Sequence, residues 1–203
     1  MSARISDDIV RSILKASGGA QPNIYSPSED TFLMLDALRI TALAGKQVLD
    51  IGTGSGVLGL FCATRGAQVT ASDIDELAIR QVASTSSLLG VKLKLVVSDL
   101  FTDVPGRFDL IIFNPPYLPS ENIQDATVDG GPLGRTLIDR FLRCLPDHLR
   151  KGGESLLLVS TLNNPSSLLG GYGKFEFSTI VKRQLFFEEL QVLRMRLRDD
   201  LSG

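Results

Sequence analysis

The chain has 203 residues, of which 43% are hydrophobic and 22% are charged, and its formal net charge is −2. This length suits one α/β domain, and we expect residues 1–203 to form a single domain with a helical extension over residues 1–20. The composition is that of a soluble globular protein, with no apolar run of about 18 residues for a membrane span. The weak net charge argues against stable nucleic-acid binding, and the charged N-terminus leaves no signal-peptide core, so we expect a cytoplasmic protein.

The predicted elements alternate between strands and helices, as in a parallel sheet covered by helices. Apolar spacing predicts a short first helix around Ile5 to Leu14 and a second over Tyr25–Thr41. The elements expected next are strand Gln47–Ile51, helix Val57–Arg65, strand Gln68–Ser72, helix Glu76–Leu89, strand Leu93–Ser98, strand Asp109–Phe113, helix Arg135–Leu149 and strand Glu154–Ser160. Two last strands, Lys174–Gln184 and Glu189–Arg198, indicate an antiparallel edge.

The sequence predicts neither a metal site nor a disulfide. Cys62 and Cys144 are far apart in the chain, and neither has a Cys or His nearby at the spacing of a metal site. We expect two reduced, buried thiols. The only histidine, His148, precedes a Gly-Gly pair at a predicted helix end and has no evident orienting partner, so we interpret it as structural.

The tetrapeptide Asn114-Pro115-Pro116-Tyr117 directly follows the predicted strand Asp109–Phe113 and is the most informative motif. Two prolines fix φ and lack an N–H, so they make a stiff wall of carbonyl acceptors beside an aromatic ring. Asn114 Oδ1 and the Pro115 carbonyl can accept the two hydrogens of a planar NH2 group while Tyr117 packs on its face. The nitrogen lone pair is then free to attack an electrophile, so the motif predicts N-methylation of an amide or of an amino group on a base.

A glycine-rich turn follows the first predicted strand. The segment Asp50-Ile-Gly52-Thr-Gly54-Ser-Gly56 closes that strand and opens a helix, so the backbone can pass close beside a ligand. Its spacing differs from the dinucleotide fingerprint G-x-G-x-x-G, and no Walker lysine follows. The turn resembles the S-adenosylmethionine-binding loop of Rossmann-like methyltransferases. Asp50 would then lie near the methionine amino group of that cofactor, directly or through water.

Acidic residues follow the next two predicted strands. Asp73 ends the second strand, where its carboxylate can bind both ribose hydroxyls of a nucleoside. Asp99 follows the third strand and can accept from the adenine amino group, with Leu100 packing on the ring. Asp75 and Glu76 are better explained as the N-cap and the first-turn acid of a helix. The pattern predicts a nucleoside site at the carboxyl ends of the strands.

These motifs together resemble the HemK/PrmC family of protein N5-glutamine methyltransferases. Residues Tyr25–Leu33 are similar to the Y-x-P-x-E-D-T-x-L signature of its archaeal and eukaryotic release-factor branch, and residues Asp129–Arg135 are similar to its D-G-G-x-x-G element. The resemblance covers roughly residues 24 to 197. It implies a Rossmann-like S-adenosylmethionine-dependent methyltransferase fold with a mostly parallel seven-stranded sheet, helices on both faces and an antiparallel C-terminal edge.

The resemblance also implies site residues and partners. Asn114, Pro115 and Tyr117 would hold a glutamine in the Gly-Gly-Gln motif of a class-1 translation release factor. The residues implied at the cofactor S-adenosyl-L-methionine are Tyr25, Thr31, Asp50, Gly52, Gly54, Gly56, Asp73, Asp99, Leu100 and Asn114. Some enzymes of this branch pair with a small zinc-binding activator protein, for which Val91–Val97 is a candidate edge strand. The lysines in this strand are equally consistent with an ordinary protected edge.

Two other interpretations stay open. A DNA or RNA methyltransferase acting on adenine N6 or guanine N2 would present the same planar NH2 to the motif, although such enzymes usually add a basic groove or a recognition domain. A non-catalytic S-adenosylmethionine-binding subunit is the other, and the intact catalytic motif argues against it. Arg135, Arg140 and Arg143 either line the substrate rim or form a solvated helix face, which we favour, and the Gly, Asp and Asn content of residues 118–132 suggests a mobile lid whose order without substrate stays open.

Overall fold

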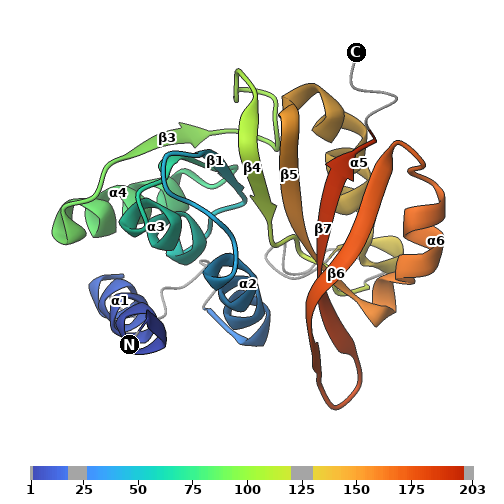
Figure 1. Cartoon of the computed structure of the whole chain (residues 1–203), viewed down its shortest axis with the longest axis horizontal. Coiled ribbons are helices and arrows are strands. Elements are labelled where there is room, and N and C mark those ends of the chain that lie inside the picture. Colours follow the sequence, from blue (N-terminus) through green and yellow to red (C-terminus); the bar gives the residue numbers. More distant parts are fainter. Residues whose placement is uncertain (1, 18–26, 120–129, 199–203) are drawn as a thin grey trace.

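One sheet organises the chain (Figure 1). The structure is a computed structural model that describes residues 2–17, 27–119 and 130–198, with side chains from Asp8 onward. Within these residues the sheet has seven strands in the order β3-β2-β1-β4-β5-β7-β6. The strands are β1 (Gln47–Ile51), β2 (Gln68–Asp73), β3 (Leu93–Val97), β4 (Phe108–Phe113), β5 (Leu149–Ser160), β6 (Phe175–Gln184) and β7 (Glu189–Leu197).

The strand directions confirm the expected architecture. Strands β1 to β5 pair in parallel, whereas β7 is antiparallel to both β5 and β6. The sheet is therefore mostly parallel with an antiparallel C-terminal edge. Because β4 lies beside β1 rather than beside β3, the strand order reverses between β1 and β4, and in open α/β sheets ligands bind at the carboxyl ends of the strands at such a point.

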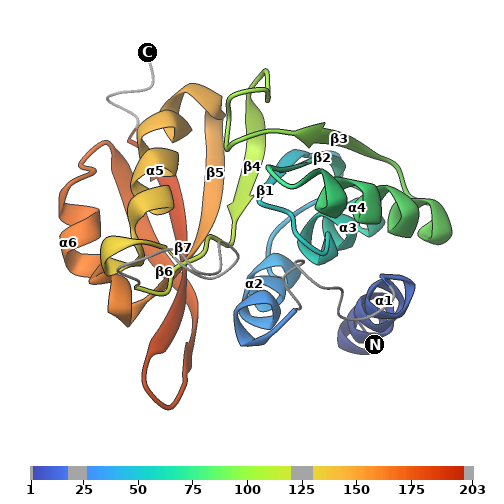
Figure 2. The same cartoon turned by 180° about the vertical axis from the view of Figure 1, so that it is seen from behind.

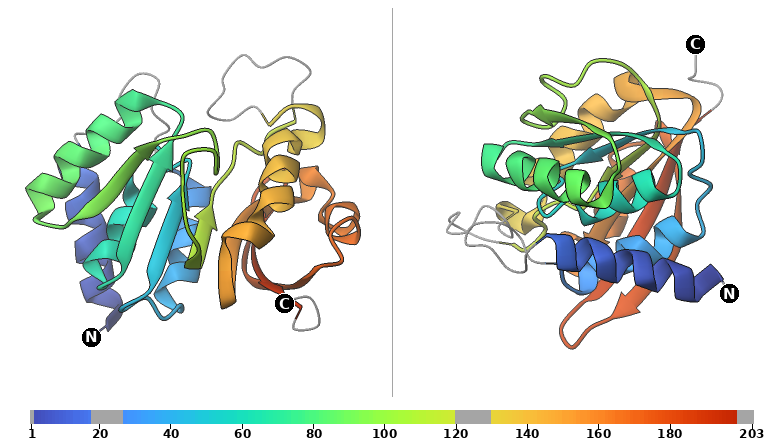
Figure 3. Two further views of the ribbon diagram at one scale, coloured as in Figure 1. Left: turned by 90° about the horizontal axis from the view of Figure 1, so that it is seen from above. Right: turned by 90° about the vertical axis from the view of Figure 1, so that its left-hand side faces the viewer.

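Helices cover both faces of the sheet, as Figures 2 and 3 show. One face carries α1 (Ser2–Ala16), α2 (Glu29–Arg39), α3 (Val57–Thr64) and α4 (Glu76–Leu89), and the other carries α5 (Thr136–His148) and the short α6 (Pro165–Gly170). Each face has its own apolar core, because successive strand residues point to opposite sides: Val48 joins one core and Leu49 the other.

Local sequence signals account for the ends of α4. The Asp75 side chain accepts from the Leu77 N–H at 2.8 Å, so Asp75 is the N-cap, as expected. The helix stops at Gly90, whose φ of +66° is the left-handed conformation that glycine adopts without a steric penalty. The two short 3-10 turns, η1 (Pro132–Gly134) and η2 (Thr161–Asn163), and helix α6 were not expected from the sequence.

Other elements differ from the expectation in their limits. Helix α2 begins at Glu29 rather than at Tyr25, because Ser28 is extended (φ −133°, ψ −160°) and serves as the N-cap position. Strand β5 begins at Leu149 rather than at Glu154, since its early part already pairs with Phe108 before the register shifts. Gly153 permits this close approach: a Cβ there would meet the Phe108 carbonyl oxygen at 2.9 Å.

The expectation of two buried thiols is half wrong. Cys62 is buried in the core under α3, whereas Cys144 is exposed. The buried residues of α5 are Ile138, Phe141, Leu142 and Leu145, and Cys144 lies off that stripe. His148 stacks on Phe101 with ring centroids 4.3 Å apart, which agrees with a structural role.

The two sheet edges differ in character. Strand β3 forms one edge, and apolar side chains beside it are exposed, namely Val97 at 47% and Leu88 of α4 at 71%. Strand β6 forms the other edge, and its hairpin with β7 projects from the sheet with Phe186 and Phe187 at the tip (Figure 1). No helix among the described residues is long and apolar enough to cross a membrane.

Candidate active site

The sheet register brings the sequence motifs to one crevice. Ile51 pairs with Phe113 on one side and with Ser72 on the other. The glycine loop after β1 therefore lies between the end of β2 and the Asn-Pro-Pro-Tyr motif after β4. Asp73 in turn pairs with Val97, so Asp99 follows at the next strand along the same edge. The predicted nucleoside site and the predicted catalytic motif are thus neighbours at the point where the strand order reverses.

The glycine loop and Asp73 are joined directly. The Gly54 N–H donates to Asp73 Oδ2 at 2.8 Å, and the Asp75 N–H donates to Oδ1 at 3.0 Å. Gly52, Gly54 and Gly56 all have positive φ, and a Cβ at Gly56 would lie 2.6 Å from Val82 of α4. Burial raises the pKa of Asp73, and the two backbone hydrogen bonds oppose that effect. Each oxygen of the carboxylate keeps further lone-pair capacity for a ligand hydroxyl.

Asp50 lies under the loop rather than on its open side. It is 1% exposed, and its Oδ2 accepts from Thr53 Oγ1 at 2.6 Å and from the Gly59 N–H at 2.9 Å. Burial raises the pKa of Asp50 to about 7, although these two hydrogen bonds lower it. The carboxyl group consequently changes its charge near neutral pH, and its ionised form would suit the ammonium group of a methionine.

The buried carboxyl of Asp50 predicts a particular pH dependence of stability. Its folded pKa of about 7 exceeds the ordinary value of 3.8, so the folded state binds more protons between these values. The resulting stabilisation is complete below pH 3.8 and is lost as the pH rises through about 7. We expect the free energy of unfolding to fall across this window, by about 1.4 kcal/mol for each unit between the two pKa values, and the variant Asp50→Asn to lack this fall.

Urea unfolding followed by circular dichroism at several pH values would measure this difference between the wild type and Asp50→Asn. The variant Asp109→Asn is a control, because Asp109 is a partly exposed carboxylate paired with Arg150 and should leave the slope across this window in place. Equal slopes for the wild type and Asp50→Asn would contradict the prediction.

The segment after β3 is strained and supported by side chains. Leu100 has a φ of +50°, which is rare for a residue with a branched side chain and costs roughly 1–2 kcal/mol. Ser98 Oγ donates to the Leu100 carbonyl at 3.1 Å and accepts from the Asp103 N–H at 3.0 Å. Asp99 accepts from Arg140 of α5 at 2.7 Å, so Arg140 is a partner of a predicted adenine contact rather than only part of a solvated helix face.

The side-chain amide of Asn114 carries one unpaired hydrogen-bond acceptor. Its Oδ1 is buried and has no hydrogen-bond partner, whereas its Nδ2 donates to Asp30 Oδ2 at 3.1 Å. A buried unpaired acceptor costs roughly 1–3 kcal/mol, and the described residues contain a few other such polar atoms, for example Gln81 Oε1 and Ser155 Oγ. The unpaired oxygen matches the expectation that Asn114 accepts a hydrogen from a substrate NH2 group.

Asp30 was not predicted as a site residue, although it lies within the Y-x-P-x-E-D-T-x-L segment. It is 2% exposed in the first turn of α2. Its Oδ1 accepts from the Thr31 N–H at 2.6 Å and from Ser28 Oγ at 2.9 Å, and its Oδ2 faces Asn114. The sequence signal was the signature itself, which carries no information on a contact between residues so far apart in the chain.

Asn163 also supports the motif and was not predicted. It is fully buried, and its Nδ2 donates to the carbonyls of Tyr117 at 2.7 Å, Leu133 at 3.1 Å and Gly134 at 3.2 Å. Its Oδ1 accepts from the Ser160 N–H at 2.8 Å. The carbonyl of Tyr117 and the turn at Gly134 are thereby attached to the end of β5.

The other predicted site residues have the following positions. Pro115 and Thr31 are buried, and Tyr117 is half-buried against the core that also contains α2 and α3. Tyr25 lies outside the described residues, as does most of the predicted lid over residues 118–132. Among the described residues, no group of three or more His, Cys, Asp or Glu could hold a metal ion.

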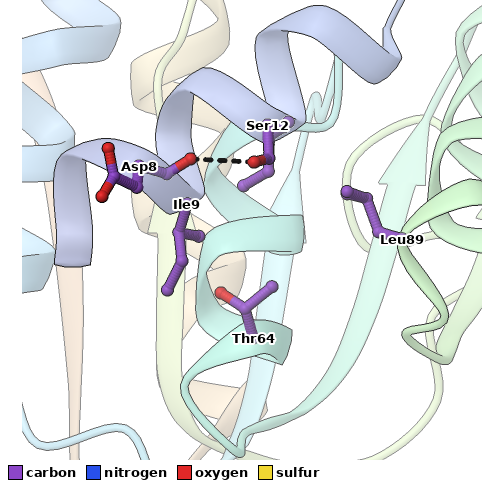
Figure 4. A pocket seen from close by; sticks show the side chains of 6 residues that line it. Asp8, Ile9, Ser12, Thr64 and Leu89 are labelled. Carbon is purple, nitrogen blue, oxygen red and sulfur yellow. Dashed lines mark hydrogen bonds between the residues drawn. The ribbon is translucent and has the colours of Figure 1, made fainter.

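A separate cavity of about 260 Å³ lies between α1, α3 and α4 (Figure 4). Thr64 and Leu89 line it, and these residues end α3 and α4 just before the chain enters β2 and β3. The cavity is therefore at the amino ends of the strands, on the opposite side of the sheet from Asn114. Its lining is mostly apolar, with the carboxylate of Asp8 as its titratable group, so it offers no arrangement for catalysis.

The described residues fit S-adenosylmethionine. Glycines at positive φ allow close backbone approach, Asp73 has capacity for ribose hydroxyls, and Asp99 with Leu100 stands at the next strand end. The buried, unpaired Asn114 Oδ1 would lie at the end where the methyl group is transferred. A mostly parallel sheet with these groups at its switch point is typical of the S-adenosylmethionine-dependent methyltransferases.

Comparison with known proteins agrees with this class and narrows it. Residues 20–185 match the family "Methyltransferase small domain". A Methanocaldococcus jannaschii protein named as an N5-glutamine methyltransferase is 35% identical over 181 residues, covering 85% of this chain and 91% of that protein. The methyltransferase HEMK2 of Homo sapiens is 34% identical over 194 residues, covering 87% and 91%. The chain belongs to the methyltransferase small domain family and, within it, to the HemK-type protein glutamine methyltransferases.

One solved structure and one more distant relative complete the comparison. The E. cuniculi Mtq2–Trm112 complex, described as responsible for methylation of the translation termination factor eRF1, has a TM-score of 0.71 and 29% identity, covering 87% of this chain and all of that one. The ribosomal RNA small subunit methyltransferase C of Chromohalobacter salexigens is 34% identical over 154 residues, which is 75% of this chain but only 42% of that protein.

Proposed function

We propose that the chain transfers a methyl group from S-adenosylmethionine to the side-chain amide nitrogen of a glutamine, in the Gly-Gly-Gln motif of a class-1 translation release factor. The observation that carries the proposal is the buried, unpaired Oδ1 of Asn114, which can accept a hydrogen bond from an N–H group of the substrate. The names of the M. jannaschii relative and of the Mtq2 complex support glutamine and a termination factor as the target. A reaction on a release factor would take place in the cytoplasm.

The proposed mechanism assigns a task to each part of the motif. Asn114 Oδ1 and the Pro115 carbonyl accept the two N–H hydrogens of the glutamine, and Tyr117 packs on the face of its amide. The bound cofactor supplies an activated methyl group on sulfur. Because an amide lone pair is delocalised into its carbonyl, the two acceptors must polarise the NH2 group and favour a pyramidal nitrogen. Asn114 Oδ1 and the Pro115 carbonyl would hold the nitrogen while it takes the methyl group that S-adenosylmethionine would supply, and the nitrogen would then lose one proton to solvent.

In this proposal, most of the rate acceleration comes from positioning the reacting atoms. The electrophile needs no further activation, so the protein mainly aligns nitrogen, carbon and sulfur and keeps water away from them. Two prolines and the Asn163 hydrogen bond to the Tyr117 carbonyl restrict the motion of the acceptors. The proposed reaction therefore needs no histidine or lysine as a general base.

The alternative substrate is an exocyclic amine of a nucleic-acid base, adenine N6 or guanine N2. It presents the same planar NH2 group, and the similarity to a ribosomal RNA methyltransferase supports it. That relative has more than half of its length outside the match, and this chain carries a net charge of −2, so a basic groove is not evident from composition.

The two substrates are separated by a methyl-transfer assay. Labelled S-adenosylmethionine would be offered with a purified archaeal or eukaryotic release factor, with the same factor carrying Gln→Asn in its Gly-Gly-Gln motif, and with bulk RNA. Label on the factor that is absent from its Gln→Asn form supports the proposal. Label on RNA alone would make the chain a nucleic-acid methyltransferase.

A small zinc-binding activator is the partner that we propose, docked on the edge strand β3. The complex formed by Mtq2 with Trm112 supports such a partner, and the edge strand β3 offers it free backbone groups and the exposed side chain of Val97. We expect Val97→Glu to prevent co-elution with a Trm112-type protein in size-exclusion chromatography. Phe186→Ser, which changes an apolar residue 91% exposed near the far edge, should leave co-elution intact. Loss of binding in both variants, or in neither, would exclude this edge.

A further inference from the structure

The contact between Asp30 and Asn114 joins two elements that are far apart in the chain. Asp30 lies in the first turn of α2 and Asn114 follows β4, 84 residues later. Asp30 is 2% exposed, and the Asn114 Nδ2 donates to its Oδ2 at 3.1 Å. Asp30 is thus shielded from bulk water, although Asn114 is only half-buried, and this shielding strengthens the electrostatic preference of the carboxylate for an N–H donor.

The chemistry of the two groups fixes the direction of the Asn114 amide. An ionised carboxylate only accepts hydrogen bonds, so the NH2 of Asn114 must face Asp30. Turning the amide over would place its oxygen against the carboxylate and lose the hydrogen bond. The Oδ1 of Asn114 is therefore held on the other side, where it is buried and unpaired.

The Asp30 carboxylate is itself held by hydrogen bonds from residues on either side of it in the chain. Its Oδ1 accepts from the Thr31 N–H and from Ser28 Oγ, and the N-terminal turn of a helix favours a negative charge. Helix α2 is in turn tied to the β6 edge, because Arg183 pairs with Glu29 at 2.5 Å and with Asp36 at 3.0 Å. A carboxylate restrained in this way can restrict the orientation of the Asn114 side-chain amide.

We propose that Asp30 is a positioning residue that orients the Asn114 amide and so makes the site accept an N–H donor rather than an oxygen acceptor. The proposal rests on the proposed N-methylation, for which it supplies the element that sets donor specificity. Asp30 acts through Asn114, so its loss should lower the rate of transfer without removing the cofactor site.

The test uses Asp30→Asn, which keeps the shape of the side chain but can turn its own NH2 toward Asn114. The control is Asp147→Asn, which removes an exposed carboxylate from α5 and leaves helix α2 and the motif untouched. The chain has five asparagines, so selective 15N labelling of asparagine gives a simple spectrum of side-chain amides, and Asn114→Ala identifies the Asn114 signal. Steady-state kinetics with the release factor would accompany the spectra.

In Asp30→Asn, we expect the Asn114 side-chain signal to move or to split into two orientations. We also expect kcat to fall on the order of tenfold to a hundredfold, with the cofactor dissociation constant unchanged within about twofold. Asp147→Asn should change neither. An unmoved Asn114 signal would overturn the proposal, as would a moved signal with an unchanged kcat.

The spectra need no substrate and therefore separate this inference from the proposed function. If the wild type fails to methylate the release factor, the glutamine proposal fails. In that case an unmoved Asn114 signal in Asp30→Asn would still overturn the role of Asp30, and a moved signal would support it.

Discussion

Replacing Asn114 by alanine is expected to lower the rate of methyl transfer by on the order of 10²–10³-fold while the fold and the cofactor affinity persist. Alanine removes the whole side-chain amide, including the buried Oδ1 acceptor. Of the two proposed acceptors for the substrate NH2 group, only the backbone carbonyl of Pro115 would then remain. The substitution also leaves Asp30 without the Asn114 Nδ2 donor, which costs some stability but does not disturb the glycine loop after β1.

Three measurements on Asn114→Ala would check this result. Labelled methyl transfer gives the rate, isothermal titration gives the affinity for S-adenosylmethionine, and thermal unfolding shows that the chain is folded. Gln68→Ala is a suitable control, because Gln68 is an exposed amide at the amino end of β2, whereas the motif lies at the carboxyl ends of the strands. If the affinity for the cofactor falls as far as the rate, Asn114 serves the cofactor rather than the acceptor substrate, and the mechanism is wrong.

Gly134→Ala should also inactivate the chain, through the shape of the motif rather than its chemistry. A Cβ on Gly134 would lie 1.8 Å from the carbonyl oxygen of Tyr117 and 2.6 Å from Asn163 Nδ2. Both neighbours are fixed, since Asn163 is fully buried and hydrogen-bonded to this carbonyl. Relief of the clash therefore requires movement of the motif, and a displacement of about 1 Å can cost 10²-fold in rate.

The strain of a left-handed alanine is a separate effect, and Gly152→Ala isolates it. Gly134 and Gly152 have similar φ values of +62° and +73°, but a Cβ on Gly152 meets nothing within 4 Å. We expect both variants to lose roughly 1–2 kcal/mol of stability from the backbone and only Gly134→Ala to lose activity. Comparable kcat values in the two variants would show that the contact with Tyr117 does not matter for catalysis.

Much of the architecture could be predicted because its signals are local. The strand and helix pattern from Gln47 to Phe113 depends on apolar spacing within each segment, and the loop after a parallel strand necessarily leaves from its carboxyl end. The order of the segments therefore predicts that the glycine loop, Asp73, Asp99 and Asn114 all lie at the carboxyl ends of the strands. The pairings of Ile51 with Ser72 and Phe113 bring those ends together.

The sequence-based expectations were wrong where a feature depends on a neighbouring element rather than on the pattern of apolar residues within its own segment. Strand β5 was expected to begin after the Gly-Gly pair, but pairing with β4 extends it back to Leu149. Cys144 was expected to be a buried free thiol, yet it is exposed because the buried stripe of α5 runs beside it. In both cases the neighbouring element, rather than the segment itself, decided the outcome.

The sequence by itself determined the class of fold, the glycine loop and the catalytic motif, since each is a pattern within one short segment. Only the tertiary structure decided how that motif is held. Asp30 reaches Asn114 because α2 packs against α3 and the strands β5 to β7, and Asn163 reaches the Tyr117 carbonyl because η2 follows the end of β5. These contacts join residues 84 and 46 positions apart, and such pairs are set by the packing of whole elements, which no local pattern of residues records.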